Sequence, residues 1–298
     1  MGPIEIEPGL RLVRAPNPSP MTHTGTNTWI VGAGGDVAVI DPGPDEAGHL
    51  AAIRAALAPG ERVGRILVTH AHRDHSPLAR RLAAATGAPV AAAGRMAQRR
   101  RPTMARLASA GGLGGGEGVD TAFAPDLVLE DGAAVTGAGW RLTALATPGH
   151  TADHLCFLWE RPGRGAAVFT GDTVMGWASS LVSPPDGDVV AFLASCRRLA
   201  QIPARVFYPG HGDPVTDPAG RLSWLIAHRE AREAQILAAL AEGPAGAATL
   251  AGRIYVDTPP ELMAAAERNV LAHLIALWER GRIRAEPALA ADATFARA

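Results

Sequence analysis

Lysine is absent from this chain of 298 residues, so all 28 of its permanently charged basic side chains are arginines. Cysteine is nearly absent, and Cys156 and Cys196 are too few for a disulfide framework. The chain also lacks an apolar run long enough to span a bilayer, and its first ten residues lack the apolar core of a signal peptide. These absences lead us to expect a cytoplasmic, reduced protein with no membrane partner.

Net charge is nearly absent as well. The 28 arginines and 29 acidic residues leave a formal charge of −1, while 47% of the residues are hydrophobic. This balance gives no general attraction to nucleic acid, so any such contact must come from a local patch. The length suits one large domain, or a large domain with a small appendage.

Three histidines and an aspartate occur together within six positions. His70, His72, Asp74 and His75 follow the apolar run Ile66–Val68, which predicts a short buried strand. The polar residues would then lie on a loop at the carboxyl end of a strand, where ligand sites of α/β folds usually form. Neutral imidazoles and carboxylates are the ligands that zinc accepts. The stretch therefore predicts a metal site and not an ordinary surface loop.

Three further predicted strands end in turns that present histidine or aspartate. His150 follows the strand 142–146, Asp172 follows 168–169, and His211 follows 205–207. Asp41, after an earlier strand, can cap the next turn or support a metal ligand by a hydrogen bond. Seven candidate ligands result, which suits two metals that share one carboxylate. They are His70, His72, Asp74, His75, His150, Asp172 and His211.

These motifs, in this order, resemble those of the metallo-β-lactamase superfamily. The resemblance implies an α/β (α+β) fold, a four-layer αββα sandwich with a dinuclear site at one edge. It also implies two Zn²⁺ ions as cofactors, with Mn²⁺ or Fe²⁺ as alternatives. Carried over by position, one ion would take His70, His72 and His150, the other would take Asp74, His75 and His211, and Asp172 would bridge them.

A closer resemblance, to the β-lactamase-like protein 2 subfamily, extends over nearly the whole chain. It rests on the segments 17–28, 147–154, 171–174, 208–212 and 227–230. It implies a small C-terminal winged-helix-like domain. We accordingly divide the chain into a hydrolase domain at 1–220 and a helical linker with a winged-helix-like domain at 221–298.

The tail itself reads as helices at 222–240, 249–255 and 261–280, with a wing strand at 282–284. A helix–turn–helix suggests DNA binding, but residues 244–285 carry five arginines against four acids, a net charge of only +1. We therefore favour a packing role, pairing with a second copy as a homodimer, or a wall of the active-site cleft.

Arginines cluster at positions 95, 99, 100, 101 and 106, ahead of a glycine-rich run at 111–116. The glycine run lacks the strand–loop–helix context and the lysine of a phosphate-binding loop. The arginines predict a solvated helix face. The alternative is a surface for an anionic substrate, held on a mobile flap.

The predicted function is metal-dependent hydrolysis, in which a hydroxide held between two ions attacks a phosphoryl or acyl centre. Asp74 could also steer the nucleophile. His154 is a candidate proton donor or partner of a metal ligand, with a purely structural role as the preferred alternative. Tyr208, His228 and Arg229 are candidate substrate contacts.

The substrate is read from the resemblance. Relatives in the closer subfamily are metal-dependent ribonucleases, which implies single-stranded RNA as the first choice. A thioester or other acyl compound is the second, because glyoxalase II proteins share all seven ligands. A winged-helix regulator that binds nucleic acid without turnover is the non-enzymatic alternative, but no ligand is missing here. A secreted β-lactamase and a flavin-linked diiron oxidoreductase are disfavoured, the former by the missing lysine and the latter by His72.

Overall fold

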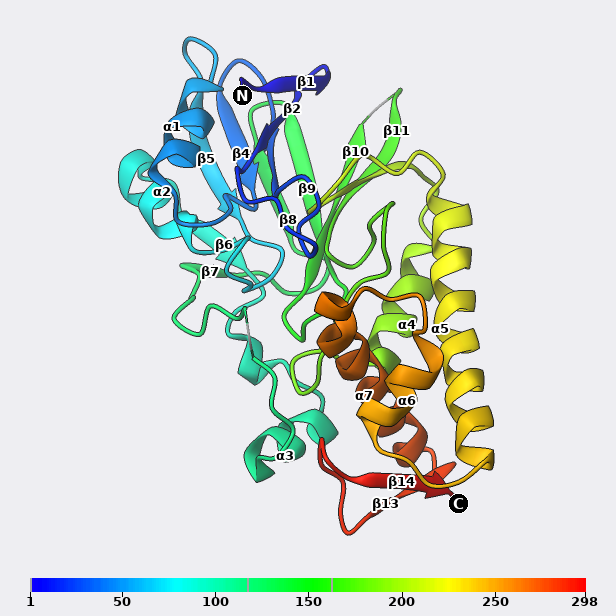
Figure 1. Cartoon of the computed structure of the whole chain (residues 1–298). Helices are drawn as coiled ribbons and strands as arrows, with labels where there is room; N and C mark the ends of the chain where they lie inside the picture. The colour runs from blue at the N-terminus through cyan, green and yellow to red at the C-terminus, as the bar shows by residue number, and fades with distance from the viewer. Residues whose placement is uncertain (1, 117, 162) are drawn as a thin grey trace.

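The computed structural model describes residues 2–116, 118–161 and 163–298. Two β-sheets pack face to face, and helices cover both outer faces (Figure 1). This architecture confirms the predicted four-layer αββα sandwich, and a smaller C-terminal domain adjoins it.

The first sheet has seven strands in chain order. They are β1 (Ile4–Glu7), β2 (Leu10–Arg14), β3 (Asn27–Val31), β4 (Asp36–Ile40), β5 (Arg62–Leu67), β6 (Val90–Ala92) and β7 (Leu127–Val128). The second sheet has the order β12-β11-β10-β9-β8. Its strands are β8 (Ala134–Gly137), β9 (Trp140–Ala146), β10 (Leu155–Arg161), β11 (Gly165–Gly171) and β12 (Ala204–Pro209).

Alternating side chains explain why these strands form a sandwich. In β3, Trp29 and Val31 enter the core between the sheets, while Ile30 faces the outer helices. The Trp29 ring lies 5.9 Å from that of Phe169 in the opposite sheet. Helices α1 (Ala47–Ala55) and α2 (Leu78–Thr86) cover the first sheet, and α4 (Val189–Leu199) and α5 (Pro218–Ala241) cover the second.

Strand direction gathers the functional loops at one edge. β4 and β5 are parallel, and so are β11 and β12, so the loops after each pair leave from the same end. The turn between the antiparallel strands β9 and β10 lies at the same edge as these loops. This edge carries Asp41, the 70–75 loop, His150, Asp172 and His211.

The C-terminal domain consists of α6 (Ala247–Ile254), a 3-10 turn η2 (Pro260–Leu262), α7 (Met263–Glu279) and a hairpin of β13 (Ile283–Glu286) and β14 (Thr294–Arg297). The predicted wing is therefore a two-stranded hairpin. Helix α5 runs along the sandwich down to this domain (Figure 1) and passes without a break through the predicted 220/221 boundary, which stays a prediction. A homodimer also stays a prediction. No helix in the described part of the chain is long and apolar enough to cross a membrane.

The arginine cluster differs from the expected solvated face. Helix α3 (Pro102–Ala110) forms, and Arg95 and Arg106 are exposed. The other three pair with distant acids. Arg99 binds Glu130 through two hydrogen bonds of 2.9 and 2.7 Å, Arg100 binds Asp186 at 2.6 Å, and Arg101 binds both Asp188 and Glu279. The helix prediction missed these partners because they lie 31 to 178 residues away.

The glycine-rich run after α3 is held against the C-terminal domain. Leu113 lies in the same core as Phe295, and Ala291 N–H donates to Gly112 O at 3.1 Å. The guanidinium of Arg268 donates to Leu113 O. The segment therefore connects the sandwich to the tail.

Candidate metal centre

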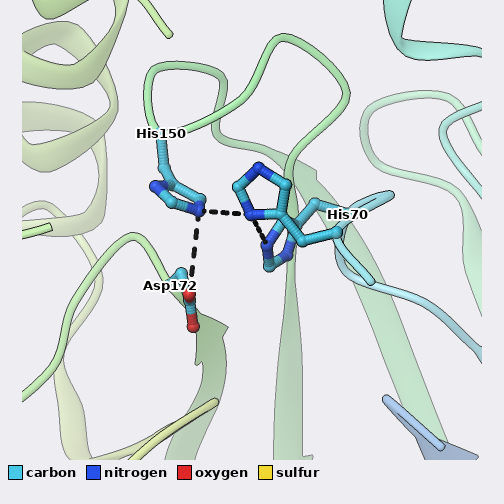
Figure 2. Close-up of side chains that lie close together, drawn as sticks. His70, His150 and Asp172 are labelled. Atoms are coloured by element: carbon cyan, nitrogen blue, oxygen red, sulfur yellow. Dashed lines mark hydrogen bonds and ion pairs between the residues drawn. The ribbon is translucent and has the colours of Figure 1, made fainter. Parts of the chain in front are cut away.

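The first group of ligands brings together His70, His72, His150 and Asp172. His72 Nδ1 lies 3.0 Å from His70 Nε2 and 3.1 Å from His150 Nε2. His150 Nε2 lies 3.7 Å from Asp172 Oδ2, and Figure 2 shows the imidazole pointing toward this carboxylate. Four ligand atoms from both sheets therefore face one point.

The second group brings together Asp74, His75 and His211. His211 Nε2 lies 3.0 Å from Asp74 Oδ2 and 3.3 Å from His75 Nε2. His75 Nε2 lies 3.3 Å from Asp74 Oδ2. These three atoms form a nearly equilateral triangle.

The spacing fits metal coordination. Two ligands of a tetrahedral zinc with bonds of about 2.1 Å are about 3.4 Å apart. The ligand contacts of 3.0 to 3.7 Å scatter around this value, and all ligand atoms of a group lie within 4.8 Å of one another. Three of these contacts join two imidazole nitrogens, and His72 Nδ1 takes part in two of them. One proton can form a hydrogen bond in only one such pair, so hydrogen bonds alone do not account for the clustering. The donor set therefore suits a cation at the centre of each group.

Asp172 lies between the two groups. Its Oδ2 is 3.4 Å from His211 Nε2 and 3.7 Å from His150 Nε2, and its Oδ1 is 3.5 Å from His75 Nε2. Oδ1 is buried and has no hydrogen-bond partner among the described residues. A buried carboxylate oxygen without a partner is costly, and a bound metal removes that cost. The position agrees with the predicted bridging role.

Hydrogen bonds on the outer ring nitrogens fix how the histidines present themselves. His150 Nδ1 donates to Leu181 O at 2.7 Å, and His211 Nδ1 lies 3.3 Å from Gly25 O. His70 Nδ1 lies 2.9 Å from the Thr69 hydroxyl. With Nδ1 protonated, Nε2 carries the lone pair that faces the site.

Asp41 connects the two groups. Its carboxylate accepts from His75 Nδ1 at 2.9 Å, from Thr69 N–H at 2.7 Å and from the Thr69 hydroxyl at 2.8 Å. The Thr69 hydroxyl in turn accepts from His70. Asp41 therefore orients His75 directly and His70 through Thr69, which supports the predicted role behind the ligands over that of a turn cap.

The electrostatics of the two groups differ. Burial lowers the pKa of His72 to about 3 and that of His70 well below its ordinary value, and neighbouring histidines add to the effect. Burial also disfavours charge on His75, but Asp74, Asp172 and Asp41 outweigh it and hold its pKa well above the ordinary value. The imidazoles of His70 and His72 in the first group therefore favour the neutral form. The carboxylates around the second group favour a positive charge there, on a protonated His75 or on a cation.

His154 does not face the cleft as a proton donor. It is 1% exposed, and Nδ1 lies 3.0 Å from the Thr147 hydroxyl and 3.1 Å from the Thr173 hydroxyl. Its Nε2 accepts from the backbone N–H of Asp172 at 3.2 Å. Both nitrogens have internal partners, so His154 is a positioning residue for the bridging carboxylate.

The three residues proposed as substrate contacts lie elsewhere. Tyr208 is 2% exposed, and its hydroxyl donates to Glu7 Oε1 at 2.7 Å within the inter-sheet region. His228 stacks on Trp224 with ring centroids 4.8 Å apart, on the outer helix α5. These placements give both residues packing roles and do not support substrate contact.

Arg229 has a structural role too. The side chain is 1% exposed, donates to Asn269 Oδ1 at 2.9 Å and to Ser180 O, and lies over the ring of Phe192. The hydroxyl of Ser180 donates to Asp172 O. Arg229 therefore supports the loop behind the bridging carboxylate without touching the cleft.

Sequence reasoning missed Asn27. Its Nδ2 donates to Pro209 O at 3.1 Å and to Gly212 O at 2.8 Å, and its N–H donates to Gly210 O at 2.7 Å. These bonds clamp the turn that carries His211. Asn27 lies in the segment 17–28 that carries the subfamily resemblance, but only the fold brings it to a turn about 180 residues away.

The cleft beside the ligands has two hollows. One, of about 180 Å³, is lined mainly by apolar side chains around Trp177. The other, of about 430 Å³, reaches Asp186, Glu267 and Arg268. His150, Leu181 and Ala265 line both, so the hollows meet at the first ligand group and against α7. The tail thus forms a wall of the cleft, one of its predicted roles.

Comparisons with known proteins agree with this site. A model of the metallo-beta-lactamase superfamily matches residues 21–211, and one of the beta-lactamase associated winged helix domain matches residues 247–291. The atrochrysone carboxyl ACP thioesterase of Aspergillus fumigatus is 30% identical over 79% of this chain and 66% of its own length. The beta-lactamase-like protein 2 homolog of Drosophila melanogaster is 28% identical over 90% of this chain and 87% of its own.

A solved structure gives the same result for the fold. A metallo-beta-lactamase family protein from Thermus thermophilus is 29% identical and covers 98% of this chain and 100% of its own, with a TM-score of 0.78. The superfamily model spans well over half of the chain and all seven ligand positions. The chain therefore belongs to the metallo-beta-lactamase superfamily, as a metal-dependent hydrolase with a C-terminal winged helix domain.

Proposed function

We propose that this hydrolase cleaves thioesters with the help of two zinc ions. When bound, such ions polarise the scissile carbonyl and lower the pKa of a water to about 7. The observation that carries the proposal is the apolar hollow that opens directly onto His150 and Asp172. A carbonyl at the ligand groups would then place an apolar substituent in that hollow.

The charges around the cleft favour a thioester over RNA. A protein that tracks an RNA backbone needs arginines that are free to meet phosphates. Arg99, Arg100 and Arg101 are instead paired with Glu130, Asp186, Asp188 and Glu279. The segment that suggested an anionic substrate thus has much of its charge neutralised within the protein. Single-stranded RNA stays a prediction without this support.

The relatives lend further support. A relative at 30% identity is described as an acyl-carrier-protein thioesterase. Two other relatives, at 28% identity, are named beta-lactamase-like protein 2 homologs, and this name specifies no substrate.

The overall reaction consumes one water. The carbon–sulfur bond of the thioester breaks, a carbon–oxygen bond to the water oxygen forms, and the products are a carboxylate, a thiol and one proton. Asp74, whose side chain is 26% exposed against 10% for Asp172, is the more accessible of the two carboxylates and would orient the water. Asp41 and His154 hold the ligands in place, as their hydrogen bonds show.

The test is a side-by-side assay of the metal-loaded protein. Hexanoyl- and acetyl-N-acetylcysteamine and S-lactoylglutathione are followed by thiol release, and a fluorogenic single-stranded RNA is followed by fluorescence. We expect thiol release that is lost in Asp172→Ala and retained in Asp213→Ala, since the Asp213 side chain is 94% exposed. Cleavage of RNA without thiol release would refute the proposal, and gel-shift binding of RNA without any turnover would favour the regulator.

A further inference from the structure

The two hollows of the cleft, which meet at His150, differ in the polarity of the side chains that line them. The small hollow is lined largely by Pro20, Met21, Met175, Trp177, Leu181 and Leu262. Its one carboxylate is that of Asp172, which belongs to the metal centre. The large hollow instead has Ser183, Asp186, Glu267 and Arg268 in its lining. His150 lies at the junction of the two.

Exposed apolar side chains mark the entrance to the small hollow. Met21 is 45% exposed and Trp177 is 38% exposed, although both are large and hydrophobic. They lie on different segments, and the His23 ring stacks on Trp177 with centroids 4.8 Å apart. Apolar surface that is left open beside a site is typical of ligand contact.

The small hollow is preformed. Arg221 of α5 donates to Met175 O and to Ala178 O, both at 2.6 Å, and so holds the loop that carries Trp177. The opposite wall comes from the C-terminal domain, through Tyr255 at the end of α6, Leu262 in η2 and Ala265 in α7. Both domains are therefore needed to build it.

Its size limits what it can hold. The volume of about 180 Å³ is slightly larger than the apolar cavity of about 150 Å³ that accepts benzene in another protein. It suits one aromatic ring or a chain of about six carbons, and it is too small for a long fatty acyl chain.

From this arrangement we infer that the small hollow is the acyl subsite and that the large hollow receives the thiol-bearing part of the substrate. The inference rests on the proposed thioester hydrolysis and narrows its substrates to compact apolar acyl groups. The scissile carbonyl then lies beside His150, where the two hollows meet. Leu262, from the C-terminal domain, is a specificity-determining residue because it closes the acyl side of the cleft.

The test measures kcat/KM for straight-chain thioesters from acetyl to dodecanoyl. Each methylene that enters the hollow is expected to raise kcat/KM about fourfold, up to about hexanoyl, with no further gain beyond. Leu262→Ala should move the optimum to longer chains, and Leu262→Trp should move it to shorter ones. Leu262→Trp should lower the hexanoyl-to-acetyl ratio about tenfold or more, and Leu262→Ala should raise the octanoyl-to-hexanoyl ratio about tenfold or more. Leu289→Ala, in the same domain but outside both hollows, should leave both ratios as in the wild type.

A binding experiment separates this inference from the proposed function. Calorimetry with hexanoate and acetate on the metal-loaded protein should show tighter binding of hexanoate, weakened in Leu262→Trp. If no thioester is hydrolysed but hexanoate still binds better, the proposed reaction fails while the apolar subsite stands. If thioesters are hydrolysed with a flat chain-length profile that neither Leu262 variant alters, the acyl subsite is refuted and the hydrolase stands.

Discussion

Asp41→Asn tests how the two ligand groups are coupled. The carboxylate is 1% exposed and accepts three hydrogen bonds, one from His75 and two from Thr69. An asparagine keeps one acceptor oxygen and places an amide N–H₂ where the other stood. At least one of the three donors then faces another donor.

The size of the effect follows from this count. A buried donor left without its acceptor costs about 1–3 kcal/mol, more beside a charged group. Loss of the partner of a metal-ligating histidine typically lowers metal affinity about 10–100-fold. Because Asp41 acts on His75 directly and on His70 through Thr69, we expect both ions to be held more weakly.

The measurement is a chelator competition that follows two metal equivalents per chain. Asp36→Asn, at the far end of the strand β4 that precedes Asp41, is the matched control; its side chain pairs with Arg62 and not with a metal ligand, so the variant should bind metal as the wild type does. Thr69→Val removes the hydroxyl that links Asp41 to His70 and should weaken one ion more than the other. Unchanged affinity for both ions in Asp41→Asn would refute the coupling.

Three further predictions follow from single features. A Cβ at Gly210 would lie 2.5 Å from Asp172 Oδ1, so Gly210→Ala should lower metal affinity in the same chelator competition. Gly252→Ala is the control and should leave the affinity unchanged, because its new Cβ meets no described atom within 4 Å. Chelation should lower the Tm, and zinc at a hundred times its Kd should restore about 2.7 kcal/mol; a Tm indifferent to metal would contradict the site. Burial and nearby arginines lower the pKa of His273 to about 3, so below about pH 6.5 the unfolded chain binds a proton that the folded one does not. Stability should therefore fall by about 2 kcal/mol between neutral pH and pH 5, and urea titrations should show a flatter fall in His273→Leu but not in the exposed-site control His23→Gln.

The ligand loops could be predicted from local patterns, because the turns at His150, Asp172 and His211 each follow a buried apolar run. The four-layer fold was predicted from the resemblance of these motifs to the metallo-β-lactamase superfamily. The short edge strand β1 and the last strand β14 were missed, since four residues with at most two buried positions give little periodicity. One-dimensional patterns are strongest where a segment packs against a core.

Contacts between distant segments could not be predicted in the same way. The ion pairs of Arg100 and Arg101 join residues more than 80 positions apart, so the segment read as a solvated face. Arg229 looked like a substrate contact, but tertiary packing buries it behind Ser180. The small hollow is likewise invisible in the sequence, because the walls carrying Trp177 and Leu262 meet only after both domains have folded.

Each ligand group takes residues from both sheets, and His211 closes the second one. A nascent chain that ends between residues 172 and 211 therefore contains every ligand of the first group but lacks the histidine that completes the second. Loading of the second ion requires β12 to have joined its sheet beside its parallel partner β11. The amount of bound metal per chain thus reports whether synthesis and folding of the sandwich have reached their last strand, which would make metal content a sensitive gauge of incompletely assembled molecules in a preparation.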